Sequence, residues 1–250
     1  MEGIEVRKLT ELEDRHWWYR ERRHLLAKAV TGLTPGTALD VGAAGGGNTR
    51  VLQGLGWKAG AVEYGADGAQ VCHERGVPVL RGDATRLPLA PASLDLVVAF
   101  DVLEHLEDDK AAAAGVFEAL RPGGTFLVAV PADPRLWSAH DDAVGHVRRY
   151  TRDTLTDLLS SAGFELDDVR SWNVLLRPAV ALKRRSSTGS DLEDLPGWLN
   201  AALYGVVVAE RYLPVGRLPG VSLLVRARRP DAPGAQASSL ASAASSATES

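Results

Sequence analysis

Four short segments follow apolar runs and carry residue types that could bind a ligand. The first runs from Asp40 through the glycine-rich stretch Gly42–Gly47. Small residues let the backbone turn sharply and approach a ligand closely, and a following helix would offer free N–H groups. Such a loop alone is equally typical of a ligand site and of a tight turn.

Acidic residues end the next three apolar runs. Glu63 could accept two hydrogen bonds from the vicinal hydroxyls of a ribose. Asp83, between Gly82 and Ala84, could accept one from the exocyclic amine of an adenine, and Asp101 follows the apolar run that ends at Phe100. Each acid by itself could be a solvated residue or a helix cap. In their order and spacing the four segments are much more specific than any one of them.

The polar loop Leu136–Tyr150 follows the fifth apolar run and could supply a general base. Histidine titrates near neutral pH, and a neighbouring aspartate can orient its ring. The candidate catalytic residues are His140, Asp141, His146 and Tyr150. The alternatives are a metal site, which we do not expect, and a structural His–Asp network with Arg148 and Arg149 in solvent.

Hydrophobic periodicity predicts the elements that position these residues. Near-continuous apolar strands alternate with helices, which is typical of a parallel sheet covered on both faces. The predicted strands are Thr37–Val41, Ala59–Glu63, Val77–Arg81, Leu94–Phe100, Thr125–Val130, Glu165–Trp172 and Val221–Ala227. The predicted helices are Leu12–Thr31, Asn48–Leu55, Ala66–Arg75, Asp109–Leu120, Thr151–Ala162, Val174–Arg184 and Gly197–Tyr212. Residues 133–150 read as a long loop.

The fold class is therefore α/β, with a doubly wound, mostly parallel seven-stranded sheet and helices on both faces. We expect an N-terminal helical cap over 1–36 and one ligand-binding domain over 37–229, with a helical insertion over about 174–219. Residues 230–250 are mostly Ala, Ser, Pro and Gly, cannot bury a core, and are expected to be disordered.

Composition excludes several classes of protein. The net charge of -4 and the pI of about 5.9 argue against a nucleic-acid-binding surface. The single cysteine, Cys72, can form neither an internal disulfide nor a thiolate metal site. No apolar run is long enough to span a membrane, and the first 23 residues lack the apolar core of a signal peptide, so we expect a cytoplasmic protein.

Over Thr37–Val130 the four segments resemble the class I S-adenosylmethionine (SAM)-dependent methyltransferases, which are Rossmann-like. The resemblance implies that Asp40 and the loop hold the methionine part, Glu63 the ribose, Asp83 and Ala84 the adenine, and Phe100 or Asp101 the amino group. The cofactor-binding residues expected on this basis are Trp17, Tyr19, Arg23, Asp40, Gly42, Ala43, Gly46, Glu63, Tyr64, Asp83, Ala84, Phe100, Asp101, Val102 and His105. Ala44 replaces the middle glycine of the family loop.

A dehydrogenase is disfavoured because the loop lacks a clean G-x-G-x-x-G, with Gly42 followed only by Gly45–Gly47. Near the start, adjacent Trp17 and Trp18 cannot both face one core, so one could cover the cofactor. Arg20, Arg22 or Arg23 could pair with the SAM carboxylate. The alternative is a helix fixed to the sheet by its aromatic side chains.

The start H-W-W-Y and the loop from Trp137 to Thr151 resemble a subgroup of bacterial small-molecule methyltransferases of natural-product, glycan and lipid pathways. This likeness covers most of residues 11–228. It implies methyl transfer from SAM, with S-adenosylhomocysteine (SAH) as product, but it does not fix the acceptor. We expect an aromatic or heteroaromatic small molecule of secondary metabolism, because Trp137, Trp172 and the apolar helices could line a pocket for it. The alternatives are a glycan or lipid-linked acceptor at a membrane surface, and a SAM-binding protein with a non-methylating role. A homodimer through the insertion stays open.

Overall fold

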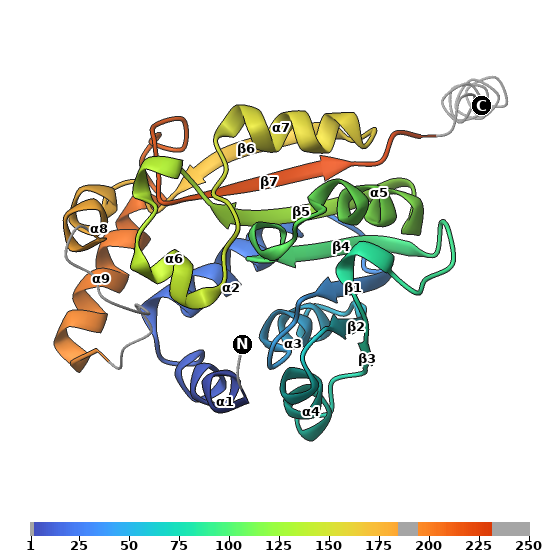
Figure 1. The fold of residues 1–250 in the computed structure, drawn as a ribbon, viewed down its shortest axis with the longest axis horizontal. Helices are drawn as coiled ribbons and strands as arrows, with labels where there is room; N and C mark the ends of the chain where they lie inside the picture. The colour runs from blue at the N-terminus through green and yellow to red at the C-terminus, as the bar shows by residue number, and fades with distance from the viewer. Residues whose placement is uncertain (1–2, 185–194, 232–250) are drawn as a thin grey trace, which may run out of the picture.

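A seven-stranded sheet forms the centre of the computed structural model, which describes residues 3–184 and 195–231 (Figure 1). The strand order is β3-β2-β1-β4-β5-β7-β6, and β7 alone runs antiparallel to its neighbours. The strands are β1 (Thr37–Val41), β2 (Lys58–Glu63), β3 (Val79–Arg81), β4 (Leu94–Phe100), β5 (Leu120–Pro131), β6 (Glu165–Trp172) and β7 (Ser222–Arg228). The doubly wound, mostly parallel sheet that the sequence predicts is confirmed.

Helices cover both faces of the sheet because each central strand alternates its side chains between two cores. In β4, Val97 and Ala99 lie in the core with α5 and α7, whereas Leu96 and Val98 lie in the core with α2 and α3. The helices are α1 (Gly3–Leu12), α2 (Trp17–Ala29), α3 (Gly47–Gly54), α4 (Ala66–Glu74), α5 (Asp109–Ala119), α6 (Ala139–Val144), α7 (Arg152–Ser161), α8 (Arg177–Arg184) and α9 (Gly197–Glu210). Three short 3-10 turns are η1 (Ala84–Arg86), η2 (Leu103–His105) and η3 (Pro134–Leu136).

Two elements differ from the prediction. The expected helix over 12–31 is interrupted: α1 ends at Leu12 and α2 begins at Trp17, where the His16 side chain accepts a hydrogen bond from the Trp18 N–H. The expected loop over 133–150 contains η3 and α6. A capping box between Ser138 and Asp141 starts α6, and this local signal was missed.

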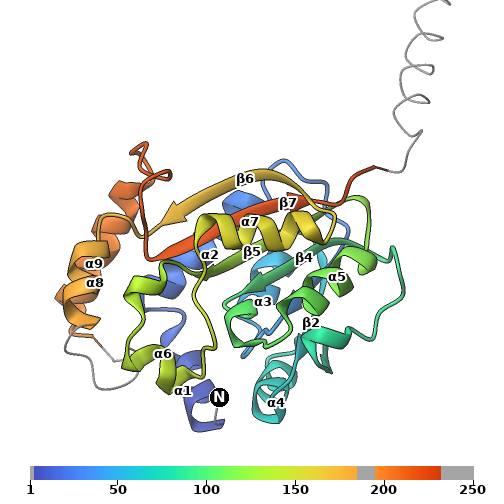
Figure 2. The ribbon, with the colours of Figure 1, turned by 45° about the horizontal axis from the view of Figure 1, so that its top comes forward.

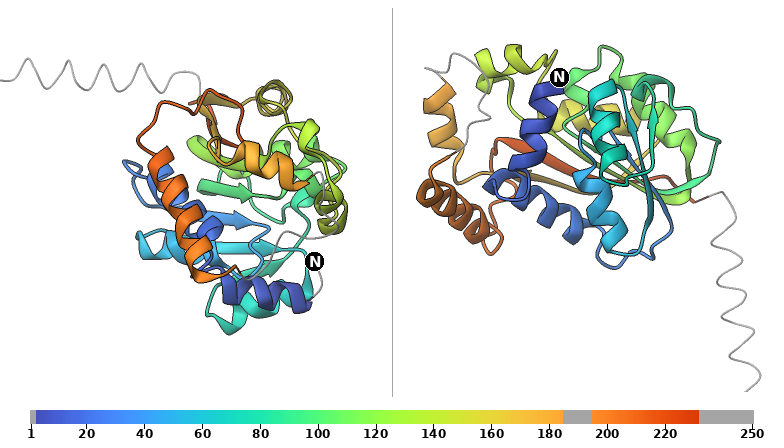
Figure 3. Two further views of the ribbon diagram at one scale, coloured as in Figure 1. Left: turned by 90° about the vertical axis from the view of Figure 1, so that its left-hand side faces the viewer. Right: turned by 90° about the horizontal axis from the view of Figure 1, so that it is seen from below.

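Several helices gather around one edge of the sheet. Helices α6, α8 and α9 lie beyond the ends of β4 and β5 (Figure 2), and α1 lies beside α4 (Figure 3). In the chain, α8 and α9 stand between β6 and β7. Most of the expected tail, 230–250, lies outside the described residues. Among the residues that are described, no helix has the length and apolarity needed to cross a membrane.

Candidate cofactor and catalytic site

The strand order reverses between β1 and β4, and doubly wound sheets bind ligands outside the carboxyl ends of the strands at such a point. The loop after β1 passes through left-handed backbone at Gly42, Ala44 and Gly46, with φ of 67°, 48° and 77°. A Cβ at Gly42 would lie 2.6 Å from Cγ2 of Val102, in the turn after β4, so position 42 requires glycine. Ala44 keeps the left-handed turn at a cost of about 1 kcal/mol.

Helix α1 closes over the far side of the glycine loop. A Cβ at Gly45 would lie 2.6 Å from the Thr10 hydroxyl, and Arg75 donates to the Gly45 carbonyl at 2.8 Å while pairing with Glu13. The side chain of Ala43 is buried in a small cluster with α4. Only the backbone of Ala43 is therefore placed to meet a ligand.

Asp40 lies inside the fold and holds the loop. Its Oδ2 accepts hydrogen bonds from the Thr49 N–H at 3.0 Å and the Thr49 hydroxyl at 2.8 Å, and the residue is 1% exposed. These bonds tie the end of β1 to the first turn of α3. These contacts are with α3, so an effect of Asp40 on a cofactor would act through the geometry of the loop that joins β1 to α3.

Asp40→Asn is expected to flatten the pH dependence of stability. Burial raises the pKa of Asp40 to about 7, above its value of about 3.9 in an unfolded chain. Between these values the folded state keeps a proton that the unfolded state has lost, so stability falls as the pH rises to about 7 and is constant above. The free energy of unfolding of the parent should fall by roughly 2–3 kcal/mol more between pH 5 and 8 than that of the variant.

Urea unfolding at the two pH values measures this difference. The Asn side chain can still accept both hydrogen bonds from Thr49, so the variant should fold. Asp83→Asn is the matched control, because hydrogen bonds from Thr85 lower the pKa of Asp83 and it stays ionised throughout this range. Equal pH slopes for the parent and Asp40→Asn would refute the assignment.

Glu63 ends β2 beside the glycine loop. Its Oε2 accepts from the Ala44 N–H at 2.8 Å and its Oε1 from the Gly65 N–H at 2.9 Å. Each carboxylate oxygen keeps a second lone pair, which two vicinal hydroxyls could use. Tyr64, the next residue, is 75% exposed and its ring is free to cover a ligand.

Asp83 caps the short turn η1. Its Oδ1 accepts from the Thr85 N–H at 2.8 Å and from the Thr85 hydroxyl at 2.7 Å. This is the helix-cap role that the sequence left open as an alternative. The two hydrogen bonds of this cap use Oδ1. A ligand contact through Oδ2, with Ala84 alongside, is therefore still possible and remains a prediction.

Asp101 follows β4 with a left-handed φ of 58° and pairs with Arg22 of α2. The two side chains form two N–H···O contacts, of 3.0 and 2.8 Å. Arg22 is buried, with its guanidinium carbon 4.8 Å from the centroid of the Phe100 ring, whereas the Asp101 side chain is 38% exposed. Burial, then the charge of Asp101, raises the pKa of Tyr19.

The sequence left open which of the neighbouring aromatic and basic residues of α2 lie at the site. The structure places them in different surroundings. Trp18 contacts Trp172 with ring centroids 4.3 Å apart and the rings tilted by 47°, and it lies beside Arg22, whereas the Trp17 backbone N–H bonds to Asn200 of α9. Of the two indoles, Trp18 is thus the better placed to cover a ligand beside Arg22. Arg23, which the sequence predicts at the ligand, pairs with Asp14 at 3.4 Å, whereas Arg22 meets Asp101.

Asp141 orients His146, one of the pairings that the sequence suggested. Its Oδ1 lies 2.8 Å from Nδ1 of His146, and the carboxylate also pairs with Arg149 at 2.8 Å and with Arg184 at 3.0 Å. Asp141 is fully buried, and so is the Arg149 side chain, which the sequence alternative left in solvent. The ring of His140 lies 6.2 Å from that of His146.

Tyr150 does not line the site. It is 3% exposed, and its hydroxyl donates to Asp109 at 2.7 Å with the Leu103 carbonyl 3.2 Å away. Burial, then the bond to Asp109, raises the pKa of Tyr150. Tyr150 thus links the turn after β4 to α5, and the catalytic role that the sequence suggests for it stays a prediction without structural support.

Glu104 is a site residue that the sequence interpretation missed. It stands in the same turn as Asp101 and His105, is 0% exposed, and has an Oε1 only 3.8 Å from Nε2 of His146. Burial, then the charge of Asp101, raises the pKa of Glu104 well above its usual value. The acid beside His105 was visible in the sequence, but its complete burial was not.

Comparisons with known proteins agree with this arrangement. Residues 14–169 match the family described as a methyltransferase domain. A protein of Mycolicibacterium smegmatis named "Probable S-adenosylmethionine-dependent methyltransferase" is 30% identical over 168 residues, which cover 65% of each chain. The chain therefore spans slightly less than two thirds of that relative.

Two solved structures share the fold at 18% identity. One is titled "Complex between the Haloferax volcanii Trm112 methyltransferase activator and the putative methyltransferase", with a TM-score of 0.63 over 92% of this chain and 96% of that one. The other is Haemonchus contortus phosphoethanolamine N-methyltransferase 2 in complex with S-adenosyl-L-methionine, with a TM-score of 0.61 over 84% and 53%. The chain belongs to the methyltransferase domain family.

Proposed function

We propose that the chain transfers a methyl group from SAM to a small-molecule acceptor. The observation that carries this proposal is the Arg22–Asp101 ion pair beside the glycine loop. Its two charges complement the two charged groups of the methionine part, so that Asp101 would bind the α-ammonium and Arg22 the α-carboxylate. Glu63 would bind the ribose hydroxyls, and Asp83, Ala84 and Tyr64 would surround the adenine.

When bound, SAM supplies a methyl group on a sulfonium, which is already a good leaving group. The protein therefore has to align the acceptor atom with the methyl carbon and exclude competing geometries. Where the acceptor must lose a proton, we propose His146 as the base. Its Nδ1 is held by Asp141, which leaves Nε2 to accept a proton. We favour His146 over His140 because the carboxylate of Asp141 is bonded to His146.

His146→Ala is expected to lower kcat by about 10²–10⁴-fold, the usual contribution of a positioned general base. The Kd for SAM should change little, because the substitution leaves Arg22, Asp101 and Glu63 in place. His140→Ala is the matched control and should have the smaller effect on kcat. Turnover that survives replacement of both histidines, with SAM binding intact, would remove the proposal of a histidine base.

The acceptor that we propose is an aromatic or heteroaromatic intermediate of secondary metabolism. Trp18 and Trp172 support it, because the two indoles lie in tilted contact next to Arg22 and the half-buried Trp18 places an aromatic ring beside the site. Trp137, a third candidate, is 40% exposed and donates to Asp142 at 3.1 Å.

A second candidate is a glycan or lipid-linked acceptor at a membrane surface. Large apolar side chains are exposed on and near α8 and α9, with Leu182 69%, Trp198 74% and Tyr212 83% exposed. Lys183 stands next to Leu182, and cations beside exposed apolar residues favour anionic interfaces. A homodimer through α8 and α9 would cover the same surface, and light scattering of the purified protein tests it.

Two measurements test the proposed function. Titration calorimetry with SAM, SAH and NAD should show binding of SAM and SAH, and preferential binding of NAD would overturn the proposal. Incubation with labelled SAM and two acceptor sets, aromatic metabolites in solution and lipid-linked glycans in vesicles, should give a product that mass spectrometry identifies as methylated. SAM binding without transfer to either set would favour a non-methylating role.

A further inference from the structure

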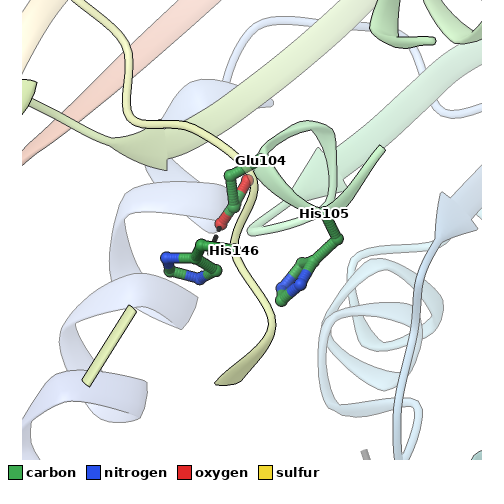
Figure 4. Close-up of side chains that lie close together, drawn as sticks. All are labelled: Glu104, His105 and His146. Atoms are coloured by element: carbon green, nitrogen blue, oxygen red, sulfur yellow. Dashed lines mark ion pairs between the residues drawn. The ribbon is translucent and has the colours of Figure 1, made fainter. Parts of the chain in front are cut away.

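Three side chains with metal-binding atoms lie together at the carboxyl end of β4. Figure 4 shows Glu104 and His105 on the turn after β4, facing His146 from the loop after α6. One ligand atom from each residue lies within 4.8 Å of the other two. The three residues come from two segments that are separated by about 40 positions, so the fold assembles the cluster.

Glu104 is a buried carboxylate in need of a partner. Neither of its oxygens has a hydrogen bond within the part of the chain that the structure describes. Its Oε1 lies 3.8 Å from Nε2 of His146, which carries a charge only if the ring is protonated. The neighbouring guanidinium groups are engaged elsewhere, since Arg22 pairs with Asp101 and Arg149 with Asp141. A charged carboxylate is costly to bury without compensation. A bound cation would supply that compensation.

Both histidines are held in the orientation that metal ligands show. Nδ1 of His146 lies 2.8 Å from Oδ1 of Asp141, and Nδ1 of His105 lies 3.2 Å from the Gly145 carbonyl oxygen. With the proton on Nδ1 in each ring, Nε2 keeps its lone pair. Histidines that ligate metals usually donate their other ring N–H to a carboxylate or a backbone carbonyl.

We propose that Glu104, His105 and His146 bind one divalent transition-metal cation. Two imidazoles and one carboxylate are typical ligands of Zn²⁺ or Fe²⁺ in sites that keep positions open, whereas Mg²⁺ prefers oxygen ligands. Metal–ligand bonds of about 2.1 Å require the three atoms to draw closer than they are here. His105 is the most exposed of the three, and its approach would require its Nδ1 contact with the Gly145 carbonyl oxygen to adjust. The expectation of no metal would then be wrong.

The cation would also define the acceptor, an inference that rests on the proposed function. Open metal positions would bind a hydroxyl oxygen of the acceptor and lower its pKa, so that its proton is lost to water. The oxygen would then form the bond to the methyl carbon while the methyl–sulfur electron pair goes to sulfur. In the metal-bound protein Nε2 of His146 would be a ligand, and the cation would replace the histidine base proposed above for the metal-free site. His146→Ala would then lower kcat by removing a metal ligand. The acceptor class is therefore a small molecule with a hydroxyl group at the methylated position.

The test is a titration of chelator-treated, tag-free protein with Zn²⁺ alone, followed by calorimetry and thermal unfolding. The parent should bind one ion per chain, and the ion should raise its Tm. Glu104→Gln, which keeps the size of the side chain, and His105→Ala, at an exposed position, should each lower the affinity by at least about 100-fold. His73→Ala removes an exposed histidine of α4 and should bind Zn²⁺ as the parent does.

Several results would overturn the proposal. One is the absence of stoichiometric binding by the parent, and another is binding that neither Glu104→Gln nor His105→Ala weakens. Unfolding of Glu104→Gln would leave His105→Ala as the deciding variant. The SAM titration is run on the same samples: SAM binding without Zn²⁺ binding refutes only the metal site, whereas Zn²⁺ binding without SAM binding refutes only the proposed function.

Discussion

Asp141→Ala is expected to lower the free energy of unfolding by about 3–5 kcal/mol at pH 7, the usual result of removing one partner of a buried ion pair. The carboxylate is fully buried and pairs with Arg149, whose side chain is also fully buried, as well as with Arg184 and His146. The variant leaves the Arg149 charge inside the protein without this partner. Guanidinium unfolding of the parent and variant measures the loss.

The pH dependence of this loss follows from the pKa of Asp141. Burial alone would raise it, but the hydrogen bond from His146 and the charges of Arg149 and Arg184 outweigh burial and lower the pKa to about 2. A depressed pKa stabilises the fold above the unfolded value of about 3.9, and the contribution is lost as the pH falls toward 2. The effect of Asp141→Ala should therefore be the same at pH 6 and pH 8 and shrink only below about pH 4.

Asp142→Ala is the matched control, because its exposed carboxylate accepts one hydrogen bond from the Trp137 indole. We expect it to change stability by less than about 1 kcal/mol. A loss for Asp141→Ala as small as that of the control would show that Arg149 finds other partners. The backbone carbonyl of Ala132, which already accepts from Arg149 at 3.0 Å, would then be the first to consider.

Arg22→Leu is expected to weaken SAM binding by about 100-fold. The buried guanidinium would make charge-assisted hydrogen bonds to the SAM carboxylate, and such bonds contribute about 1.5–3 kcal/mol each. The variant also removes the ion-pair partner of Asp101. Titration calorimetry at fixed ionic strength measures the Kd for SAM and SAH.

Arg23→Leu is the control for Arg22→Leu. It tests whether weaker SAM binding comes from the loss of the Arg22 side chain itself or from the loss of any positive charge on α2. Arg23 pairs with Asp14, so its replacement should change the Kd less than about threefold. Arg22→Lys should fall between the parent and Arg22→Leu, because lysine keeps the charge but not the two-pronged geometry. A folded Arg22→Leu protein that binds SAM as tightly as the parent would contradict the proposed carboxylate site.

The sheet and the loop at the end of β1 were predictable because their signals are local. Apolar runs alternate with helical spacing, and the stretch after Asp40 consists of small residues that tolerate left-handed backbone. Parallel strands bring their carboxyl ends to one edge, so Glu63, Asp83 and Asp101 could be assigned to that edge from the chain alone. The prediction failed where a local signal was overlooked, as at the cap of α6.

The sequence by itself determined the strands, the glycine loop and the acids that end the strands, since each depends on neighbours a few residues away. Only the tertiary structure decided which side chains meet. Arg22 reaches Asp101 across 79 positions, Arg184 reaches Asp141 across 43, and nothing in the local pattern separates Arg22 from Arg23. The tertiary structure also decided which side chains are buried, because burial depends on elements that are distant in the chain. The Glu104 oxygens are buried without a hydrogen-bond partner among the described residues, and Tyr150 is only 3% exposed.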